Sequence, residues 1–243
     1  MEVFTEKDYT GIVEDSPYAT EFMVMGYADG ARSVIPHKFF RDWLDGEAQT
    51  GNFYIGRCSG FGVGSLVKYD SGQQGLSVGR FVSGGLRLRF ILNGQHDMRT
   101  ISTYMFVTIG EGFDSVPPPQ YGDSIIKNDV WIGDEVVMMG GGIIENGCVI
   151  GARSLLPPNF RSEPYGIYGG SPARLIRYRF SEPVRTALLE LAWWEMPLSW
   201  LRDNNAMFLI DMTADEALAL DVVAALKESR QLFEANAASG STD

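Results

Sequence analysis

The chain contains two histidines, His37 and His96, in different surroundings. Histidine changes its protonation near neutral pH, so it is the side chain best suited to general acid–base chemistry. His96 lies in residues 93–122, a stretch with several aromatics and three consecutive prolines. A loop of this length in a compact domain is usually functional or disordered. The surroundings therefore favour a functional role for His96, whereas His37, beside aromatic residues, is expected to be structural or exposed.

The two cysteines, Cys58 and Cys148, offer little further chemistry. Their spacing is typical of neither a metal site nor a redox motif, and a disulfide framework is not expected. Cys148 falls at a small position of the repeat described next, so we expect it to pack in the interior.

A six-residue repeat organises residues 126–156. Large apolar side chains stand six apart at Ile126, Ile132, Met138, Ile144, Ile150 and Leu156. Small or narrow residues follow each of the first five after four positions, at Val130, Val136, Gly142, Cys148 and Ser154. Neither a strand nor an amphipathic helix has this period, which is typical of a parallel β-helix. We expect Ile126 to stack on Ile144 and Ile132 on Ile150, roughly 4.8 Å apart, with Gly133 and Gly151 relieving backbone strain at the corners.

The same spacing begins at Ile55 and is interrupted once, across residues 71–75. The two blocks make about a dozen units, or roughly four coils, enough for a continuous core. Phe90 and Ile126 are separated by a multiple of six residues, so the stretch between them reads as an excursion that returns in register.

We therefore predict a mainly β fold, a left-handed parallel β-helix with a protruding loop and C-terminal α-helices. Its parts are an N-terminal segment (1–50), the β-helix (51–160) with its excursion (93–122), a coil cap with helices (161–238) and a disordered tail (239–243).

Three helices are suggested outside the repeat. A short one is expected from Pro36 to Leu44. A second is capped by Ser181 and buries the face that carries Val184, Leu188 and Leu191, stopping near Pro197. The third opens with the capping box Thr213–Glu216.

The net charge of −11 and the pI of about 4.7 argue against a nucleic-acid-binding protein, which needs a basic surface. The first residues lack the apolar core of a signal peptide. A run of about 18 apolar residues, as a membrane span requires, is also missing. The sequence thus predicts a cytoplasmic protein without membrane partners.

Four segments together resemble the hexapeptide-repeat xenobiotic acetyltransferases, which include streptogramin and chloramphenicol acetyltransferases and have sugar O- and N-acetyltransferases as relatives. The segments are IGRCSGFGVG (55–64), NGQHDMRTISTYMF (93–106), NDVWIGDEVVMMGGGIIENGCVIGARSLL (128–156), and YGGSPARLIRYRF with its AWWEMP tract (168–197). The run Gly140–Gly142 departs from the proline–glycine pair usual in the family, and we expect it to alter the groove locally.

The resemblance implies acetyl transfer from acetyl-CoA to a saccharide or an antibiotic, with His96 as the general base. It implies a cofactor groove between neighbouring β-helices, formed by Trp131, Gly133, Gly151, Ala152, Arg153, Ser171, Pro172, Arg174 and Arg177. Arg179 extends this cationic cluster. Tyr54, Asp97 and Tyr104 are candidates for binding the acceptor, and Asp97 with Arg99 could orient the base or the acceptor. The family forms homotrimers with shared active sites.

Two other functions remain open. A β-helical zinc enzyme of the γ-carbonic anhydrase type needs three histidines around the metal, and the chain has two. A non-catalytic β-helix that serves as an assembly module would bind no acetyl-CoA and would tolerate loss of His96. Release of CoA thiol distinguishes this module from an enzyme.

Overall fold

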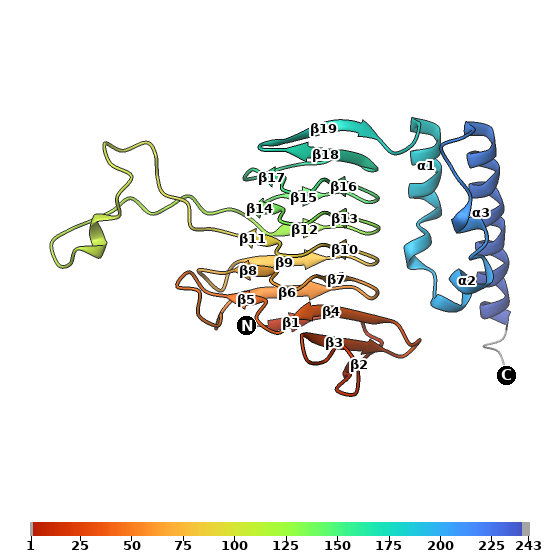
Figure 1. Cartoon of the computed structure of the whole chain (residues 1–243), viewed down its shortest axis with the longest axis horizontal. Helices are drawn as coiled ribbons and strands as arrows, with labels where there is room; N and C mark the ends of the chain where they lie inside the picture. Colours follow the sequence, from red (N-terminus) through yellow and green to blue (C-terminus); the bar gives the residue numbers. More distant parts are fainter. Residues whose placement is uncertain (1, 240–243) are drawn as a thin grey trace.

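The computed structural model describes residues 2–239, which form a three-sided prism of β-strands flanked by helices (Figure 1). Each side of the prism is one sheet, and neighbouring strands in a sheet come from successive coils. Face A comprises β1 (Glu2–Phe4), β6 (Asn52–Ile55), β9 (Gly75–Val78), β12 (Ser124–Ile126) and β15 (Ile143–Ile144). Face C comprises β5 (Phe40–Arg41), β8 (Leu66–Lys68), β11 (Arg89–Ile91), β14 (Val137–Met139) and β17 (Leu155–Leu156).

Face B is the longest sheet and has an antiparallel piece at each end. It comprises β2 (Tyr9–Ile12), β3 (Phe22–Tyr27), β4 (Arg32–Pro36), β7 (Gly60–Phe61), β10 (Ser83–Gly84), β13 (Trp131–Ile132), β16 (Val149–Ile150), β18 (Gly166–Gly170) and β19 (Ala173–Tyr178). β2, β3 and β4 form a meander at one end, and β18 with β19 forms a hairpin at the other. The strands between them pair in parallel. The expected mainly β fold with parallel faces is thus confirmed.

Stacked apolar side chains fill the prism. On face A, Ile126 pairs with Ile144 on one side and Val78 on the other. On face B, Ile132 pairs with Ile150. All five side chains are buried, and both predicted stacks are confirmed.

The corners of the prism are built differently from the prediction. The left-handed backbone conformation falls on Glu135 (φ 60°) and Arg153 (φ 61°), whereas Gly133 and Gly151 do not adopt it. Gly133 is required by space instead, because a Cβ there would lie 2.6 Å from the backbone nitrogen of Ala152 in the next coil. Glycine at this position lets successive coils approach closely.

The helix expected from Pro36 to Leu44 is wrong. The segment forms β5 and a turn, and Phe39 points into the prism with no exposed surface. Its ring stacks on Phe61 at 5.4 Å and meets Phe53 edge-on at 5.5 Å. Burial of an aromatic side chain of this size outweighs the weak local preference for a helix.

Residues 93–122, called the arm below, leave the prism between β11 on face C and β12 on face A. Figure 1 shows the arm projecting well away from the strands. Its regular structure is limited to the short 3-10 helix η1 (Phe106–Thr108). Phe90 of β11 still pairs with Met138 of β14, so the arm is an insertion that leaves the coil in register.

The C-terminal helices form a second apolar core beside the prism, and Figure 1 shows them on the side away from the arm. They are α1 (Glu182–Leu191), η2 (Trp193–Glu195), α2 (Leu198–Asp203), η3 (Met207–Leu209) and α3 (Glu216–Ser239). The predicted apolar face of α1 is confirmed, because Val184, Leu188 and Leu191 are all buried. The single helix expected to run to about Pro197 is replaced by α1 and η2. Ser239, the first residue of the predicted disordered tail, belongs to α3, and residues 240–243 lie outside the described residues.

The predicted helix caps agree with the structure only in part. Ser181 occupies the N-cap of α1 but makes no side-chain capping bond. At α3, Asp215 Oδ1 accepts the backbone N–H groups of Ala217 and Leu218, whereas Thr213 bonds to Asp211. An aspartate directly before the helix serves as its cap, and the capping box was therefore placed two residues too early.

Candidate functional site

The imidazole of His96 is held by a backbone carbonyl. His96 is exposed on the arm, and its Nδ1 lies 2.6 Å from the carbonyl oxygen of Thr103. A carbonyl oxygen only accepts hydrogen bonds, so Nδ1 carries the proton. Nε2 of the neutral ring is then unprotonated and can accept a proton. The local geometry is that of a histidine prepared to act as a base.

Asp97 does not orient this histidine. Its carboxylate accepts the backbone N–H of Arg99 at 2.8 Å and pairs with the guanidinium of the same residue. These hydrogen bonds hold the pKa of the Asp97 carboxyl below its usual value. The group that orients His96 is the Thr103 carbonyl, which sequence reasoning missed because backbone carbonyls carry no residue-specific signal.

His96 borders a pocket of about 640 Å³ between the base of the arm and the prism. This arm pocket is lined by Trp43, Lys68, Tyr69, Asp70, Ser71, Ile91, Asn93, Gly94, Gln95, His96, Met105, Thr108, Pro118 and Gln120. Its volume lies within the range of about 300–1,000 Å³ found for small-molecule sites. Trp43, which is 69% exposed, was not foreseen as a site residue. Its signal was an aromatic residue in the turn sequence DWLDG.

Two of the three residues expected to bind the acceptor lie near His96, and the third lies elsewhere. Tyr104 and Asp97 line a small cavity of about 20 Å³ together with His96. Tyr54 lies elsewhere, on β6 of face A, and is absent from the lining of the arm pocket. Burial raises the pKa of the Tyr54 hydroxyl, and Glu6 contributes in the same direction. Within one chain, the structure brings Tyr104 and Asp97 to His96 but not Tyr54.

Trp131 is the most conspicuous of the residues expected to bind the cofactor. It projects from β13 with 59% of its surface exposed. Its partners on the neighbouring strands are Ser83 and Val149, both smaller than tryptophan. Pairing continues from Val149 to Ile167 and then to Arg177. Three strand spacings, or roughly 14 Å, therefore separate Trp131 from Arg177 along face B.

The remaining expected cofactor residues lie at one corner and at the end of this face. Gly133 and Ala152 are in close contact at the corner between faces B and C, next to Gly151 and Arg153. There Arg153 forms an ion pair with Glu135 at 2.8 Å. Ser171 and Pro172 form the turn between β18 and β19.

The arginines near this end have different roles. Arg174 and Arg177 on β19 bond only to neighbouring backbone carbonyls and make no ion pair within residues 2–239. Arg179 pairs with Asp129 at 3.1 Å, bonds to Gly147 and packs on the ring of Tyr165. Arg179 thus stabilises the fold, whereas Arg174 and Arg177 are available for an anion.

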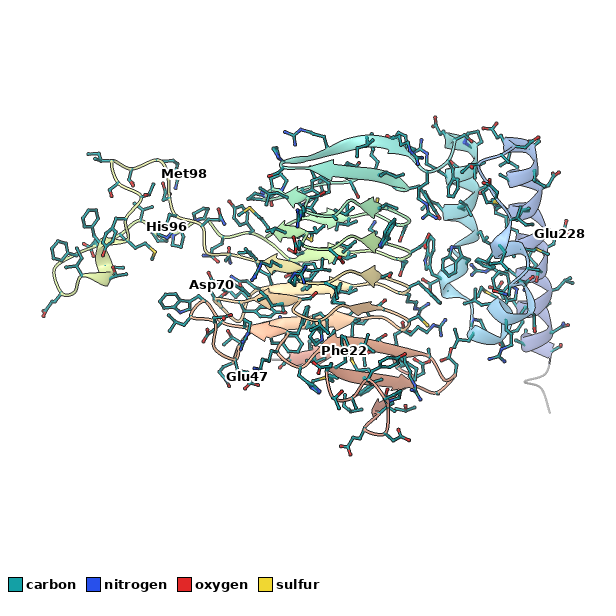
Figure 2. The ribbon with its side chains drawn as sticks, viewed as in Figure 1. Phe22, Glu47, Asp70, His96, Met98 and Glu228 are labelled. Atoms are coloured by element: carbon teal, nitrogen blue, oxygen red, sulfur yellow. The ribbon has the colours of Figure 1, made fainter. Side chains whose placement is uncertain are left out.

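The cofactor candidates and His96 lie on different sides of the same prism. The arm that carries His96 leaves between faces C and A, whereas Trp131 belongs to face B. Figure 2 shows His96 and Met98 on the arm, far out from the labelled strands of Figure 1. The arm pocket contains none of the expected cofactor residues. One chain therefore does not bring the two halves of the expected site together.

The part of the chain that the structure describes offers no ligand set for a zinc enzyme. Within residues 2–239, no group of three or more His, Cys, Asp or Glu side chains is placed to hold a metal ion. The helices in the same range include none that is long and apolar enough to cross a membrane.

Comparison with known proteins identifies relatives of the chain. A probable macrolide acetyltransferase of Lysinibacillus sphaericus is 41% identical over 149 residues, which cover 59% of this chain and 82% of the relative. The chain belongs to the hexapeptide-repeat xenobiotic acetyltransferases. A second member of this acetyltransferase family, a chloramphenicol acetyltransferase of Agrobacterium fabrum, is 36% identical over 62% of this chain and 76% of the relative.

No protein-family model matches the chain. Among solved structures, that of the N-acyltransferase AntD of Bacillus cereus is 21% identical in sequence, with a TM-score of 0.44. The match covers 66% of this chain and 87% of the AntD chain. That likeness is too slight to bear on the site. The membership in the acetyltransferase family rests on the sequence relatives.

Proposed function

We propose that this enzyme transfers an acetyl group from acetyl-CoA to a hydroxyl or amine of a saccharide or an antibiotic, with His96 as the general base. The observation that carries the proposal is the bond from His96 Nδ1–H to the Thr103 carbonyl, which leaves Nε2 free beside the arm pocket. When bound, acetyl-CoA supplies the acetyl group as a reactive thioester.

His96 acts on the acceptor in this proposal. Nε2 takes the proton from the acceptor hydroxyl or amine as that group forms its bond to the acetyl carbon. The imidazolium then gives the same proton to the departing sulfur, so the base is regenerated. The Thr103 carbonyl stabilises the imidazolium through the bond to Nδ1 and keeps the ring in position.

The residues of face B fit a CoA thioester. CoA is polyanionic, and a chain with a net charge of −11 needs local cations to hold it. Arg174 and Arg177 supply such cations, because their guanidinium groups are free of ion pairs in the described chain and suit phosphate geometry. Trp131 offers an exposed apolar surface for the rest of the molecule.

We further propose that the complete site is shared between two subunits of a homotrimer of left-handed β-helices. The arm of one subunit would lie across face B of the next and place His96 near the neighbour's donor site. The arm is rich in exposed apolar side chains, such as Met98, Ile101 and Phe113, which need a partner to cover them. Threefold symmetry closes such a head-to-tail contact.

The acceptor is proposed to occupy the arm pocket. Trp43 offers a flat apolar face on the wall of this pocket, and its volume suits a molecule of drug size. Tyr104 and Asp97 border the histidine from the arm side.

The domain boundaries and the cytoplasmic location expected from the sequence remain predictions.

Release of CoA thiol from acetyl-CoA, measured with a panel of amino sugars, deoxy sugars and antibiotics, tests the proposal. His96→Ala should lower turnover by at least about a hundredfold. His37→Gln is the matched control, because His37 bonds to the Ala19 carbonyl on the prism side and is absent from both cavities near His96. If no acceptor releases thiol and CoA gives no thermal shift, the assembly-module alternative is favoured. If His96→Ala retains its turnover, the general-base role is wrong.

A further inference from the structure

The two ends of the arm meet on one buried side chain, Asn93, which is 5% exposed. Its Nδ2 donates to Gln120 Oε1 at 2.9 Å and to Asp70 Oδ1 at 3.4 Å. Its Oδ1 accepts the backbone N–H of Tyr121 at 3.4 Å. Asn93 begins the arm, Gln120 and Tyr121 end it, and Asp70 follows β8 on the prism. One amide thus joins three segments of the chain, and we call this arrangement the Asn93 clasp.

The anchor of the clasp on the prism is itself fixed. The backbone N–H of Asp70 donates to Gln74 Oε1 at 3.0 Å, and Gln74 Nε2 donates back to the Asp70 carboxylate. Gln74 is buried. Asp70 directly precedes the interruption of the six-residue repeat at 71–75, and Gln74 lies within it. The interruption therefore supplies a rigid attachment point for the arm.

Gly140, on the next coil, lies against Leu92, the residue before the arm, and against Tyr121 at its end. A Cβ on Gly140 would overlap the carbonyl oxygen of Leu92 and would come within 3.0 Å of the Cβ of Tyr121. Gly140 does not have a left-handed φ, so space alone requires glycine there. The first glycine of the Gly140–Gly142 run is thus explained by the chain that crosses it at Leu92 and Tyr121.

We propose that Asn93 and Gly140 are positioning residues that set the direction in which the arm leaves the prism, and with it the location of His96. The inference rests on the proposed role of His96, which follows Asn93 by three residues. Both amide N–H groups of Asn93 are occupied within the chain. Asn93 also lines the arm pocket, but with both N–H groups occupied it has no free donor for an acceptor there, so we assign it a role through the arm.

Two variants, Asn93→Leu and Gly140→Ala, test the proposal, each with a matched control. Asn204→Leu is the control for Asn93, because Asn204 is also buried and bonded through Nδ2 but lies at the end of α2, among the C-terminal helices. Gly122→Ala is the control for Gly140, because a Cβ at Gly122 would meet no atom within 4 Å. The readouts are kcat, the KM for acetyl-CoA and amide hydrogen exchange over residues 94–119.

Asn93→Leu and Gly140→Ala should lower kcat by about tenfold to a hundredfold, since small misplacements of a catalytic group cost this much. The KM for acetyl-CoA should stay within about twofold, because face B is untouched. Exchange in the arm should accelerate in both variants and in neither control. The positioning role would be overturned if Asn93→Leu lost as much stability as Asn204→Leu but kept its kcat and the amide exchange of its arm unchanged.

Hydrogen exchange separates this inference from the general-base proposal. Accelerated exchange in Asn93→Leu, together with full activity of His96→Ala, would uphold the clasp and refute the base. Unchanged exchange in both Asn93→Leu and Gly140→Ala would overturn the clasp whatever His96 does. Gly140→Ala could fail to fold, in which case Asn93→Leu alone decides.

Discussion

The Nδ1 atom of His96 lies 2.6 Å from the carbonyl oxygen of Thr103, and this contact determines which ring nitrogen is free. We predict that the neutral imidazole is protonated at Nδ1 and unprotonated at Nε2. Nitrogen-15 NMR of the histidine side chains measures this directly. A His96 ring protonated at Nε2 would contradict the assignment of Nε2 as the base.

Asp97 gives a pH prediction with a definite sign. Hydrogen bonds from Arg99 lower the pKa of its carboxyl from the ordinary 3.8, so the unfolded chain takes up a proton first as the pH falls. The contribution of this pair to the order of the arm is then complete above pH of about 4 and is lost as the pH drops through the lowered pKa. Carbon-13 NMR of the Asp97 carboxyl should show titration below 3.8. Titration at or above that value would mean that the pair does not form.

The same pair should not govern activity near neutral pH. Asp97→Asn should leave the acidic limb of the kcat/KM profile where it is in the unaltered enzyme, because the carboxyl is already ionised there. A shift of that limb in Asp97→Asn would assign a proton-transfer role to Asp97 instead.

Trp43 should bind the acceptor without affecting the donor. Removal of an aromatic face from a ligand site costs about 1–2 kcal/mol, or roughly fivefold to thirtyfold in affinity. Trp43→Ala should therefore raise the KM of the acceptor and leave the KM of acetyl-CoA unchanged. Tyr18→Ala is a suitable control, since Tyr18 is similarly exposed and absent from the arm pocket. Equal effects on both substrates would argue against an acceptor site in this pocket.

Substitutions of the β19 arginines should affect CoA binding, whereas a substitution of Arg179 should affect the stability of the fold. The double variant Arg174→Ala, Arg177→Ala should weaken CoA binding in a salt-dependent manner and leave the melting temperature unchanged. Arg179→Ala should lower the free energy of unfolding by about 1–3 kcal/mol, because it leaves the half-buried Asp129 without its partner. Titration calorimetry and thermal melts test the two effects. A loss of stability in the double variant would assign Arg174 and Arg177 to the fold.

The repeat made the interior of the prism predictable from sequence. Ile126, Ile132, Ile144 and Ile150 recur with a spacing that only a coil of fixed length satisfies, and the excursion was visible because its ends kept the same spacing. The region around Phe39 could not be predicted in this way, since its strand depends on rings contributed by Phe53 and Phe61.

The candidate site was only partly predictable. His96 was identified by its residue type and by the length of the loop around it. The Thr103 carbonyl, the Asn93 clasp and the Trp43 wall depend on contacts between segments that are distant in sequence or on backbone atoms. Neither leaves a periodic signal in the chain, so these parts became visible only in the folded structure.

The separation of His96 from Trp131 within one chain leads to the most direct test of a shared site. Co-expression of His96→Ala with Trp131→Asp, each inactive alone, should restore activity in mixed trimers. With equal amounts and random assembly, half of the arms and half of the donor faces are intact, so about one quarter of the sites should be active. Activity of the mixture at about one quarter of the unaltered enzyme would support a site formed by the arm of one subunit and face B of the next. A mixture no more active than its two components would place the whole site within one chain and contradict the account.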